Sequence, residues 1–282
     1  NMIQDSNYLF SINNKVALVI GGRGKIGFEI SCSLAKLGAR VIVASRSVTK
    51  EQSISKSFKK SKIDDIVMDA SNEEDVLKNV KLIEEKYGKI DILINSSSWR
   101  PMTKFMEDSI ENWEESIKKN SSAFFIPSRV VGEKMAKINS GSIINISSIY
   151  GINAPPMSIY ENCDFITEPD YPFLKAGCIG LSKYLSSYFA KNNVRVNVVA
   201  PGGVSNNQPI EFSNNYNNRV PMGRMANAED IVGAVIFLAS DVSTHSKTIE
   251  KTPAVSKSFA SLKILFLSFI FFPLYLNFPF CD

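Results

Sequence analysis

The fold is decided by residues 15–27, which read KVALVIGGRGKIG. The apolar run that follows Lys15 has the length of a buried strand, and residues 26–37 carry apolar side chains at helical spacing. The turn between them holds Gly22, Gly24 and Gly27 in the pattern GxGxxG. Such glycines let backbone N–H groups approach a pyrophosphate at a helix N-terminus. A simple tight turn is the alternative, but four glycines in seven residues between a strand and a helix favour a dinucleotide site.

Strand-like and helix-like segments alternate along the rest of the chain. Apolar runs predict strands over 40–44, 63–68, 90–94, 142–146 and 194–199, and helical spacing predicts helices near 72–86, 109–137, 175–191 and 227–240. This alternation predicts an α/β domain with a doubly wound parallel sheet, covered by helices on both faces. The stretch 200–226, rich in Asn, Pro and Gly, is expected to be a long functional loop.

The composition is typical of a globular protein. The 282 residues are 44% hydrophobic and 21% charged, enough for one large α/β domain or two small ones. The net charge of +4 is mild, and no basic run interleaved with aromatic residues indicates nucleic acid. The polar start of the chain, which contains Asp5, predicts no signal peptide and therefore a cytoplasmic protein.

The cysteines and the histidine do not predict a metal site. No two cysteines have metal-ligand spacing, and buried free thiols in a reducing compartment are expected at Cys32, Cys163, Cys178 and Cys281. The single histidine, His245, argues against histidine-based catalysis and against a histidine metal centre.

The charges near the glycine turn bear on the choice between NADP and NAD. An acidic residue at the end of the second strand would bind the ribose 2′-OH and repel a 2′-phosphate, but Ser45 occupies that position here. Arg46 follows it, and Arg23 and Lys25 lie in the turn. These cations favour NADP, with NAD as the alternative if they are ordinary solvated side chains.

Two further polar positions follow predicted strands. Asp69 comes just after the third strand, where a carboxylate could reach the adenine amino group or cap the next helix. Asn95 opens the run Asn95–Ser98 after the fourth strand, at the carboxyl edge where ligands bind in such sheets.

Tyr171 and Lys175 stand four residues apart, with Ser148 upstream at the end of a predicted strand. A tyrosine beside a lysine can act as a proton donor at neutral pH. A solvent-facing helical pair is the alternative for these two residues alone. With the glycine turn, they favour hydride transfer to a carbonyl or from an alcohol.

The chain carries a set of motifs in a fixed order. They are Gly21–Gly27, Asp91–Asn95, Asn120, Ile144–Ser148, Tyr171–Gly177, Val194–Val204, Pro221–Met225 and Glu229–Ile231. Over residues 12–242 the chain therefore resembles the short-chain dehydrogenase/reductase family. The resemblance implies a Rossmann fold with strand order 3-2-1-4-5-6, a nicotinamide cofactor and a homo-oligomer.

The resemblance also implies residue roles. Tyr171 is the general acid or base, Lys175 favours the phenolate and binds the nicotinamide ribose, and Ser148 hydrogen-bonds the substrate oxygen. Asn120 holds a water that links Lys175 to solvent. The expected cofactor-binding residues are Gly21, Gly22, Arg23, Gly24, Ile26, Gly27, Ser45, Arg46, Asp69, Asn95, Tyr171, Lys175, Pro201, Gly202 and Val204.

The spacing of the tyrosine departs from the family. Family members place it twelve or thirteen residues after the serine, whereas here 171 − 148 = 23. Tyr160 has the usual spacing, but the residue four positions later is Asp164 rather than lysine. We therefore assign Tyr171 and expect roughly ten inserted residues to form a loop near the substrate mouth.

The C-terminal tail, residues 243–282, matches nothing in the family. It is apolar from Ile264, with 18 uncharged residues up to Cys281, and it contains Pro273 and Pro279. Loss of the reading frame is the favoured explanation, and a membrane anchor or an alternative packed ending are the others. The seventh strand is accordingly predicted to be missing or atypical.

The predicted substrate is a small molecule with polar groups. The loops at 99–101, 152–170 and 204–220 carry several acids and amides, which favours a hydroxylated or sugar-like substrate. A 3-oxoacyl-carrier-protein reductase is the alternative. A catalytically impaired protein that only binds the cofactor is the second alternative.

Overall fold

The structure, a computed structural model, describes residues 10–47, 52–61, 63–244 and 264–265. Its centre is a seven-stranded parallel sheet in the order β3-β2-β1-β4-β5-β6-β7. The strands are β1 (Val16–Ile20), β2 (Arg40–Ser45), β3 (Asp64–Val67), β4 (Ile92–Asn95), β5 (Gly141–Ile146), β6 (Val194–Val199) and β7 (Ile264–Leu265). The predicted α/β class and the predicted order of the first six strands are confirmed.

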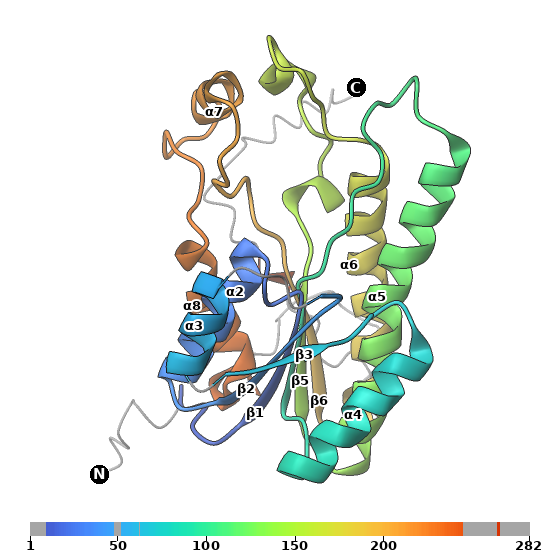
Figure 1. Ribbon diagram of the computed structural model, residues 1–282, viewed down its shortest axis with the longest axis vertical. Coiled ribbons are helices and arrows are strands. Elements are labelled where there is room, and N and C mark those ends of the chain that lie inside the picture. Colours follow the sequence, from blue (N-terminus) through green and yellow to red (C-terminus); the bar gives the residue numbers. More distant parts are fainter. Residues whose placement is uncertain (1–9, 48–51, 62, 245–263, 266–282) are drawn as a thin grey trace, which may run out of the picture.

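Helices cover both faces of the sheet (Figure 1). They are α2 (Lys25–Lys36), α3 (Gln52–Lys60), α4 (Glu73–Tyr87), α5 (Ile110–Lys137), α6 (Asp170–Phe189), α7 (Ile210–Asn217) and α8 (Glu229–Ala239). Helices α2, α3 and α8 pack on one face, and α4, α5 and α6 pack on the other (Figure 1).

The alternation of side chains along β1 builds the two layers of the core. Ala17 and Val19 pack with α2, α3 and α8, whereas Val16, Leu18 and Ile20 pack with the opposite helices. Because all five side chains are buried, the strand is apolar throughout rather than alternating with polar residues.

Helix α6 differs from its prediction in a way that matters for the site. It begins at Asp170, about one turn before the predicted start near Lys175. Pro172 lies in its first turn, where the missing N–H has no intrahelical partner to lose. Tyr171 and Lys175 consequently lie on one continuous helix, a turn apart.

Two helices were not predicted. Helix α3 has polar residues at most positions, and α7 lies inside the stretch predicted to be a loop. Phe212 and Tyr216 of α7 are buried, so tertiary packing stabilises a segment whose local sequence has many asparagines.

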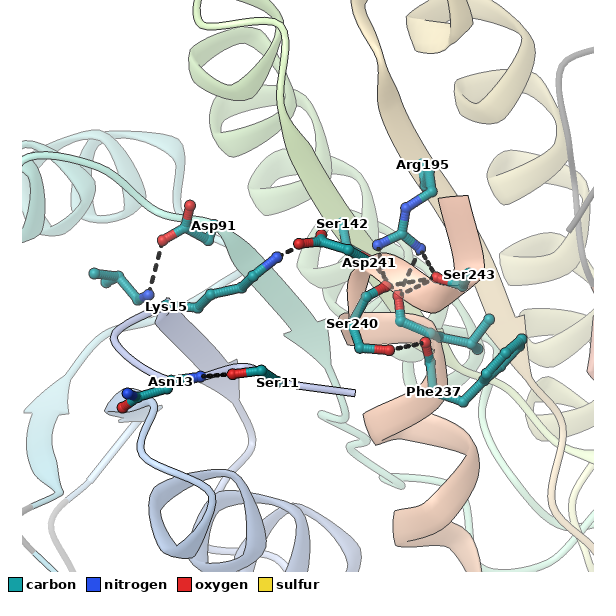
Figure 2. A network of polar contacts seen from close by, with 12 residues as sticks. Ser11, Asn13, Lys15, Asp91, Ser142, Arg195, Phe237, Ser240, Asp241 and Ser243 are labelled. Atoms are coloured by element: carbon teal, nitrogen blue, oxygen red, sulfur yellow. Dashed lines mark hydrogen bonds and ion pairs between the residues drawn. The ribbon is translucent and has the colours of Figure 1, made fainter. Parts of the chain in front are cut away.

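At the amino ends of the strands, a polar network ties the sheet to α8 (Figure 2). The Arg195 guanidinium donates to the carbonyl oxygens of Leu238 at 2.6 Å and Ser240 at 3.2 Å, and it also contacts Ser243. Burial lowers the pKa of Arg195 to about 10, opposed by the charge of Asp241. A cation thus neutralises the carbonyl end of α8, where the helix dipole is negative.

The seventh strand has two residues, which pair with Val198 and Val199 at the β6 edge. The prediction of an atypical last strand is therefore confirmed. Of the predicted 243–282 tail, the structure describes only residues 243–244 and 264–265, and the other residues of the tail lie outside the described part of the chain. Within the described ranges, no helix combines the length and apolarity needed to cross a membrane.

Candidate active site

The carboxyl ends of the strands open onto a cleft of about 700 Å³. Its lining comes from the glycine turn, from the ends of β2 and β5, from the start of α6 and from the segments that follow β3, β4 and β6. Of the residues predicted for the site, it includes Gly21, Arg23, Gly24, Ile26, Gly27, Ser45, Arg46, Asp69, Asn120, Ser148, Tyr171, Lys175, Pro201, Gly202 and Val204. Residues from distant parts of the chain thus meet at one edge of the sheet.

The glycine turn can pack closely against its neighbours only because side chains are absent there. Gly21 adopts φ +75°, and a Cβ on it would lie 2.7 Å from the Ser97 nitrogen. A Cβ on Gly27 would lie 2.4 Å from the Gly21 oxygen. Helix α2 starts directly after Gly24, so its N-terminal amides face the cleft as an anion-binding end. The turn fits the pyrophosphate of a dinucleotide.

Two residues predicted to bind the cofactor do not line the cleft. Gly22 packs behind it, where a Cβ would lie 2.8 Å from the Val43 side chain. Asn95 is fully buried, and its amide donates to Ser128 Oγ at 3.0 Å and to Asn145 Oδ1 at 2.7 Å. Asn95 therefore joins β4 to β5 and α5 in the interior.

The cations near the end of β2 differ in their exposure and in their contacts. Arg23 forms an ion pair with Asp65 and lies over the Phe58 ring, so its predicted approach to a 2′-phosphate competes with these contacts. Lys25 and Arg46 are exposed at the cleft. β2 ends at Ser45, so this position carries a hydroxyl in place of a carboxylate. The Ser45 hydroxyl donates to the Ser47 oxygen at 3.0 Å.

Asp69 lines the cleft, and its carboxylate stabilises the turn after β3. It accepts hydrogen bonds from the Ser71 backbone at 2.9 Å and from the Ser71 hydroxyl at 2.7 Å. The cap of α4 is Asn72, whose side chain accepts from the Asp75 nitrogen. The helix-cap alternative for Asp69 is therefore wrong.

Lys175 is held in a buried position beside Tyr171. Its Nζ donates to the Ile146 oxygen at 2.9 Å and lies 5.6 Å from the centre of the Tyr171 ring. The Ser147 hydroxyl donates to the Lys175 oxygen at 2.8 Å, which fixes α6 against the end of β5. Lys175 is therefore fixed beside Tyr171, where both residues line the cleft.

Ser148 is the second residue after β5 and is 6% exposed. Its hydroxyl oxygen accepts from the Tyr150 nitrogen at 3.2 Å, which fixes the rotamer while the oxygen still faces the cleft lining. The hydroxyl hydrogen can then be donated to a substrate oxygen.

The Asn120 side chain is engaged with the segment after β4. Its Oδ1 accepts from the Trp99 nitrogen at 2.9 Å, and its Nδ2 donates to the Trp99 oxygen at 2.8 Å and the Ser116 oxygen at 3.0 Å. These bonds engage the side-chain amide of Asn120 and fix Trp99 to α5.

The insertion after Ser148 folds over one end of the cleft. Tyr160 packs with Ile159, Phe212, Tyr216 and Met225 in a small buried cluster. The Tyr160 hydroxyl donates to Thr167 Oγ1 at 2.6 Å, and burial raises the pKa of this phenol. Tyr160 therefore belongs to the packing of the insertion, and Tyr171 is the tyrosine beside Lys175.

Several lining residues were not predicted individually, although they lie in the predicted substrate loops or in the Pro221–Met225 motif. Thr167, Gln208, Phe212, Tyr216 and Met225 reach the cleft only because the insertion and α7 pack together. The Tyr216 hydroxyl accepts from the Gly203 nitrogen and so connects α7 to the segment after β6. No motif or spacing in the sequence links these positions.

The described cysteines are unpaired. Cys32 and Cys178 are buried as predicted, and burial raises the pKa of the Cys178 thiol to about 11, whereas Cys163 is only half-buried. Cys281 and His245 lie outside the described residues. No group of three or more His, Cys, Asp or Glu side chains in the described part of the chain could hold a metal ion.

Comparisons with known proteins agree on one family. A family model described as enoyl-(acyl carrier protein) reductase matches residues 22–247. The 3-oxoacyl-[acyl-carrier-protein] reductase of Chlamydia muridarum is 33% identical over 242 residues, 82% of this chain and 92% of that protein.

Two solved structures have the same fold. A short chain dehydrogenase from Leptospira borgpetersenii with bound NAD+ has a TM-score of 0.77 at 31% identity, over 87% of this chain and 92% of its own. A gluconate 5-dehydrogenase from Burkholderia cenocepacia, in complex with NADP and tartrate, has a TM-score of 0.76 at 25% identity. The match covers 86% of this chain and 94% of that protein's chain.

Proposed function

This chain belongs to the short-chain dehydrogenase/reductase family, and from that membership we propose that it uses NADP to interconvert a carbonyl and an alcohol on a polar, sugar-like substrate. It is an NAD(P)-dependent oxidoreductase acting on CH–OH or carbonyl groups. The choice of NADP, the residue roles and the substrate class are the proposed parts.

The observation that carries the proposal is the meeting of two groups of residues in one cleft. The turn Gly21–Gly27 lies at one part of its wall, and Ser148, Tyr171 and Lys175 lie at another. A bound nicotinamide cofactor supplies the hydride. The chain has to bind the substrate oxygen, move one proton and exclude competing water.

Each catalytic residue has a role that its contacts support. In reduction, the Tyr171 hydroxyl donates the proton to the carbonyl oxygen as the hydride reaches the carbon, and in oxidation it accepts that proton. The Lys175 ammonium stabilises the resulting phenolate, and the Ser148 hydroxyl donates to the substrate oxygen as negative charge develops there.

We assign Asn120 a positioning role through Trp99. A water bound to its amide would compete with bonds to the Trp99 backbone and to Ser116. The predicted water relay from Lys175 to solvent stays a prediction, and it would have to use groups of Asn120 other than its side-chain amide. The Asn120 amide instead fixes the segment that borders the substrate.

The preference for NADP rests on the end of β2. Arg46 is exposed there, and Ser45 leaves the position without a carboxylate. Asp65 is the nearby acid on β3, and its ion pair with Arg23 neutralises it. A 2′-phosphate is therefore attracted rather than repelled, although NAD stays the alternative.

A second candidate is the reduction of 3-oxoacyl groups on a carrier protein. The relatives' names favour it, since the Chlamydia muridarum protein is a 3-oxoacyl-[acyl-carrier-protein] reductase. The polar side chains of Arg100, Asn206 and Gln208 in the cleft lining favour a hydroxylated substrate instead.

One experiment separates these functions. Purified protein is titrated with NADPH and NADH by fluorescence, and its turnover is then compared on sugar-like carbonyls and on a 3-oxoacyl carrier substrate. We expect tighter NADPH binding and faster turnover of the sugar-like compounds. Binding without any turnover would favour an impaired cofactor-binding protein, and binding of neither cofactor would contradict the proposed function.

The proposed function also includes the bounds of the domain, its oligomeric state and its location in the cell. We take residues 12–242 as one catalytic domain, because the described cores of both sheet faces lie within them. The homo-oligomer stays a prediction from the resemblance, and the cytoplasmic location stays a prediction from the polar start of the sequence.

A further inference from the structure

We infer that Arg100 selects substrates that carry a carboxylate close to the reacting carbon. This inference rests on the proposed function, because it assumes that the substrate binds against Tyr171. It narrows the proposed substrate class from polar compounds in general to acids, such as a sugar acid or another small hydroxy or oxo acid.

The first observation is the position of the Arg100 side chain. Its guanidinium carbon lies over the Tyr171 ring, 4.0 Å from the ring centre, and the residue lines the same cleft as Ser148 and Lys175. Arg100 is exposed, and no ion pair joins it to a carboxylate among the described residues. A cation beside the proposed proton donor is thus open to an anion.

The second observation is the fixed backbone that carries this cation. Both backbone polar groups of Trp99 are bonded to the Asn120 amide, at 2.9 Å and 2.8 Å. The Lys119 ammonium lies 4.3 Å from the centre of the Trp99 ring. Pro101 restricts the backbone of Arg100, the residue that precedes it. Arg100 therefore projects from an anchored segment, which reduces the entropy lost when it binds a ligand.

The third observation is the sign of the charges around the cleft. The cations in its lining are Arg23, Lys25, Arg46, Arg100, Lys119 and Lys175. Among the described lining residues the one carboxylate is Asp69, after β3. The phosphates of a dinucleotide account for the cations near the glycine turn and β2, but they do not account for Arg100 beside Tyr171.

Glu168, a buried acid of the insertion, forms no ion pair with Arg100. Glu168 is 6% exposed, and its two carboxyl oxygens lack a hydrogen-bond partner in the described structure. Burial raises the pKa of Glu168, and the charge of Arg100 lowers it only in part. Since no hydrogen bond or ion pair joins Glu168 to Arg100, the Arg100 guanidinium keeps its donors for a ligand.

A carboxylate fits this position better than a neutral hydroxyl. The guanidinium is a planar fork that binds a carboxylate through two parallel hydrogen bonds. Its distance from the Tyr171 ring places such a group near the carbon whose oxygen Tyr171 contacts. The substrate would be oriented by its charged end and by its reacting oxygen at once.

The test compares matched acids and neutral compounds. Turnover of aldonates and oxo acids is measured beside their neutral amides or alcohols, in wild type, Arg100→Gln and Arg100→Lys. We expect the kcat/KM ratio of acid to neutral compound to fall about tenfold or more in Arg100→Gln, and less in Arg100→Lys. Lys104→Gln, on an exposed lysine paired with Glu107 outside the cleft, is the control.

A binding measurement makes the test independent of turnover. The complex with NADP+ is titrated by calorimetry with tartrate and with threitol, its uncharged analogue. We expect tartrate to bind more tightly than threitol in wild type, and Arg100→Gln to remove that difference. Equal binding of both compounds in wild type, or an unchanged acid-to-neutral ratio in Arg100→Gln, would overturn the inference.

The two proposals fail in different ways. If the acid preference is absent while NADPH binding and carbonyl turnover persist, only the role of Arg100 is lost. If wild type binds neither cofactor, the proposed function itself fails.

Discussion

At the scale of single residues, Arg46 is the exposed cation that follows β2. We predict that Arg46→Ala raises the KM for NADPH about tenfold and changes the KM for NADH little, because only NADPH carries the 2′-phosphate. Arg40→Ala, at the exposed opposite end of the same strand, is the matched control. Equal losses for both cofactors would contradict this role.

Glu168 is the residue whose protonation should affect stability. Burial, followed by the charges of Asp108 and Asp170, raises its pKa in the folded protein. Its contribution to folding is therefore fully present below the ordinary glutamate pKa and is lost as the pH rises through the raised value.

Glu168→Gln removes this titration. We expect the variant to gain free energy of unfolding relative to wild type as the pH rises from about 4 to about 8, measured by urea denaturation at each pH. Glu161→Gln, at an exposed position of the same insertion, is the matched control. Parallel curves for Glu168→Gln would show that its carboxyl titrates alike in both states.

The residues of the site could be predicted where a motif fixes them locally. Tyr171 was preferred over Tyr160 because Lys175 follows at helical spacing, and the structure places that lysine beside Tyr171. Asn95 and Gly22 were expected in the cleft because of their motifs, but their side-chain positions face the interior. The hydrogen bonds of Asn120 depend on Trp99, 21 residues earlier, and no local pattern encodes that pairing.

At the scale of elements, the close approach of β1, the glycine turn and α2 depends on Gly27. Gly27→Ala would place a methyl group 2.4 Å from the Gly21 oxygen, so the turn must move. We predict a loss of NADPH affinity of at least about tenfold, measured by fluorescence titration.

The control for this substitution is Gly233→Ala in α8. The added methyl group meets no heavy atom within 4 Å there, and alanine is the better helix former. This variant should keep its NADPH affinity and gain slightly in thermal stability. Unchanged affinity in Gly27→Ala would contradict the fit of the turn to a pyrophosphate.

The contact between β6 and α8 depends on Arg195 (Figure 2). Arg195→Met removes the guanidinium donors from the carbonyls of Leu238 and Ser240. We predict that the free energy of unfolding falls by about 1–3 kcal/mol in urea denaturation. Arg40→Met, at the exposed start of β2, should have little effect, and equal effects of the two variants would contradict the role of this network.

Elements with strong apolar periodicity were predictable, and those held by tertiary contacts were not. Both ends of the strands β1, β2, β5 and β6 lie within about one residue of their predicted positions, because each strand is a continuous buried run. The start of α6 was placed about one turn too late. Helix α7 was missed because its asparagines favour turns, while Phe212 and Tyr216 anchor it to the insertion.

At the scale of the whole molecule, the parallel sheet creates the site by bringing its strand ends together. Segments near residues 21, 46, 69, 97, 148 and 202 meet at its carboxyl edge, although they are far apart in the chain (Figure 1). The order of the strands followed from the alternation of strands and helices and from the family resemblance. The two-residue β7 did not follow, since the sequence after Ser243 has neither strand periodicity nor a family motif.

The same edge joins a cofactor site to a proton donor, and the function of the molecule depends on that junction. The Tyr171 hydroxyl contributes to chemistry and is only one of many expected contacts to the cofactor, whereas the glycine turn contributes to binding. A substitution at Tyr171 should therefore affect the two properties differently.

NADPH consumption by wild type and Tyr171→Phe, on a panel of sugar-like, acidic and 3-oxoacyl carbonyls, tests this junction most directly. NADPH binding is measured in parallel by fluorescence. We predict that Tyr171→Phe loses about a hundredfold or more in kcat on every active substrate, while its NADPH dissociation constant stays within about threefold of wild type. Turnover by Tyr171→Phe at the wild-type rate would contradict the account.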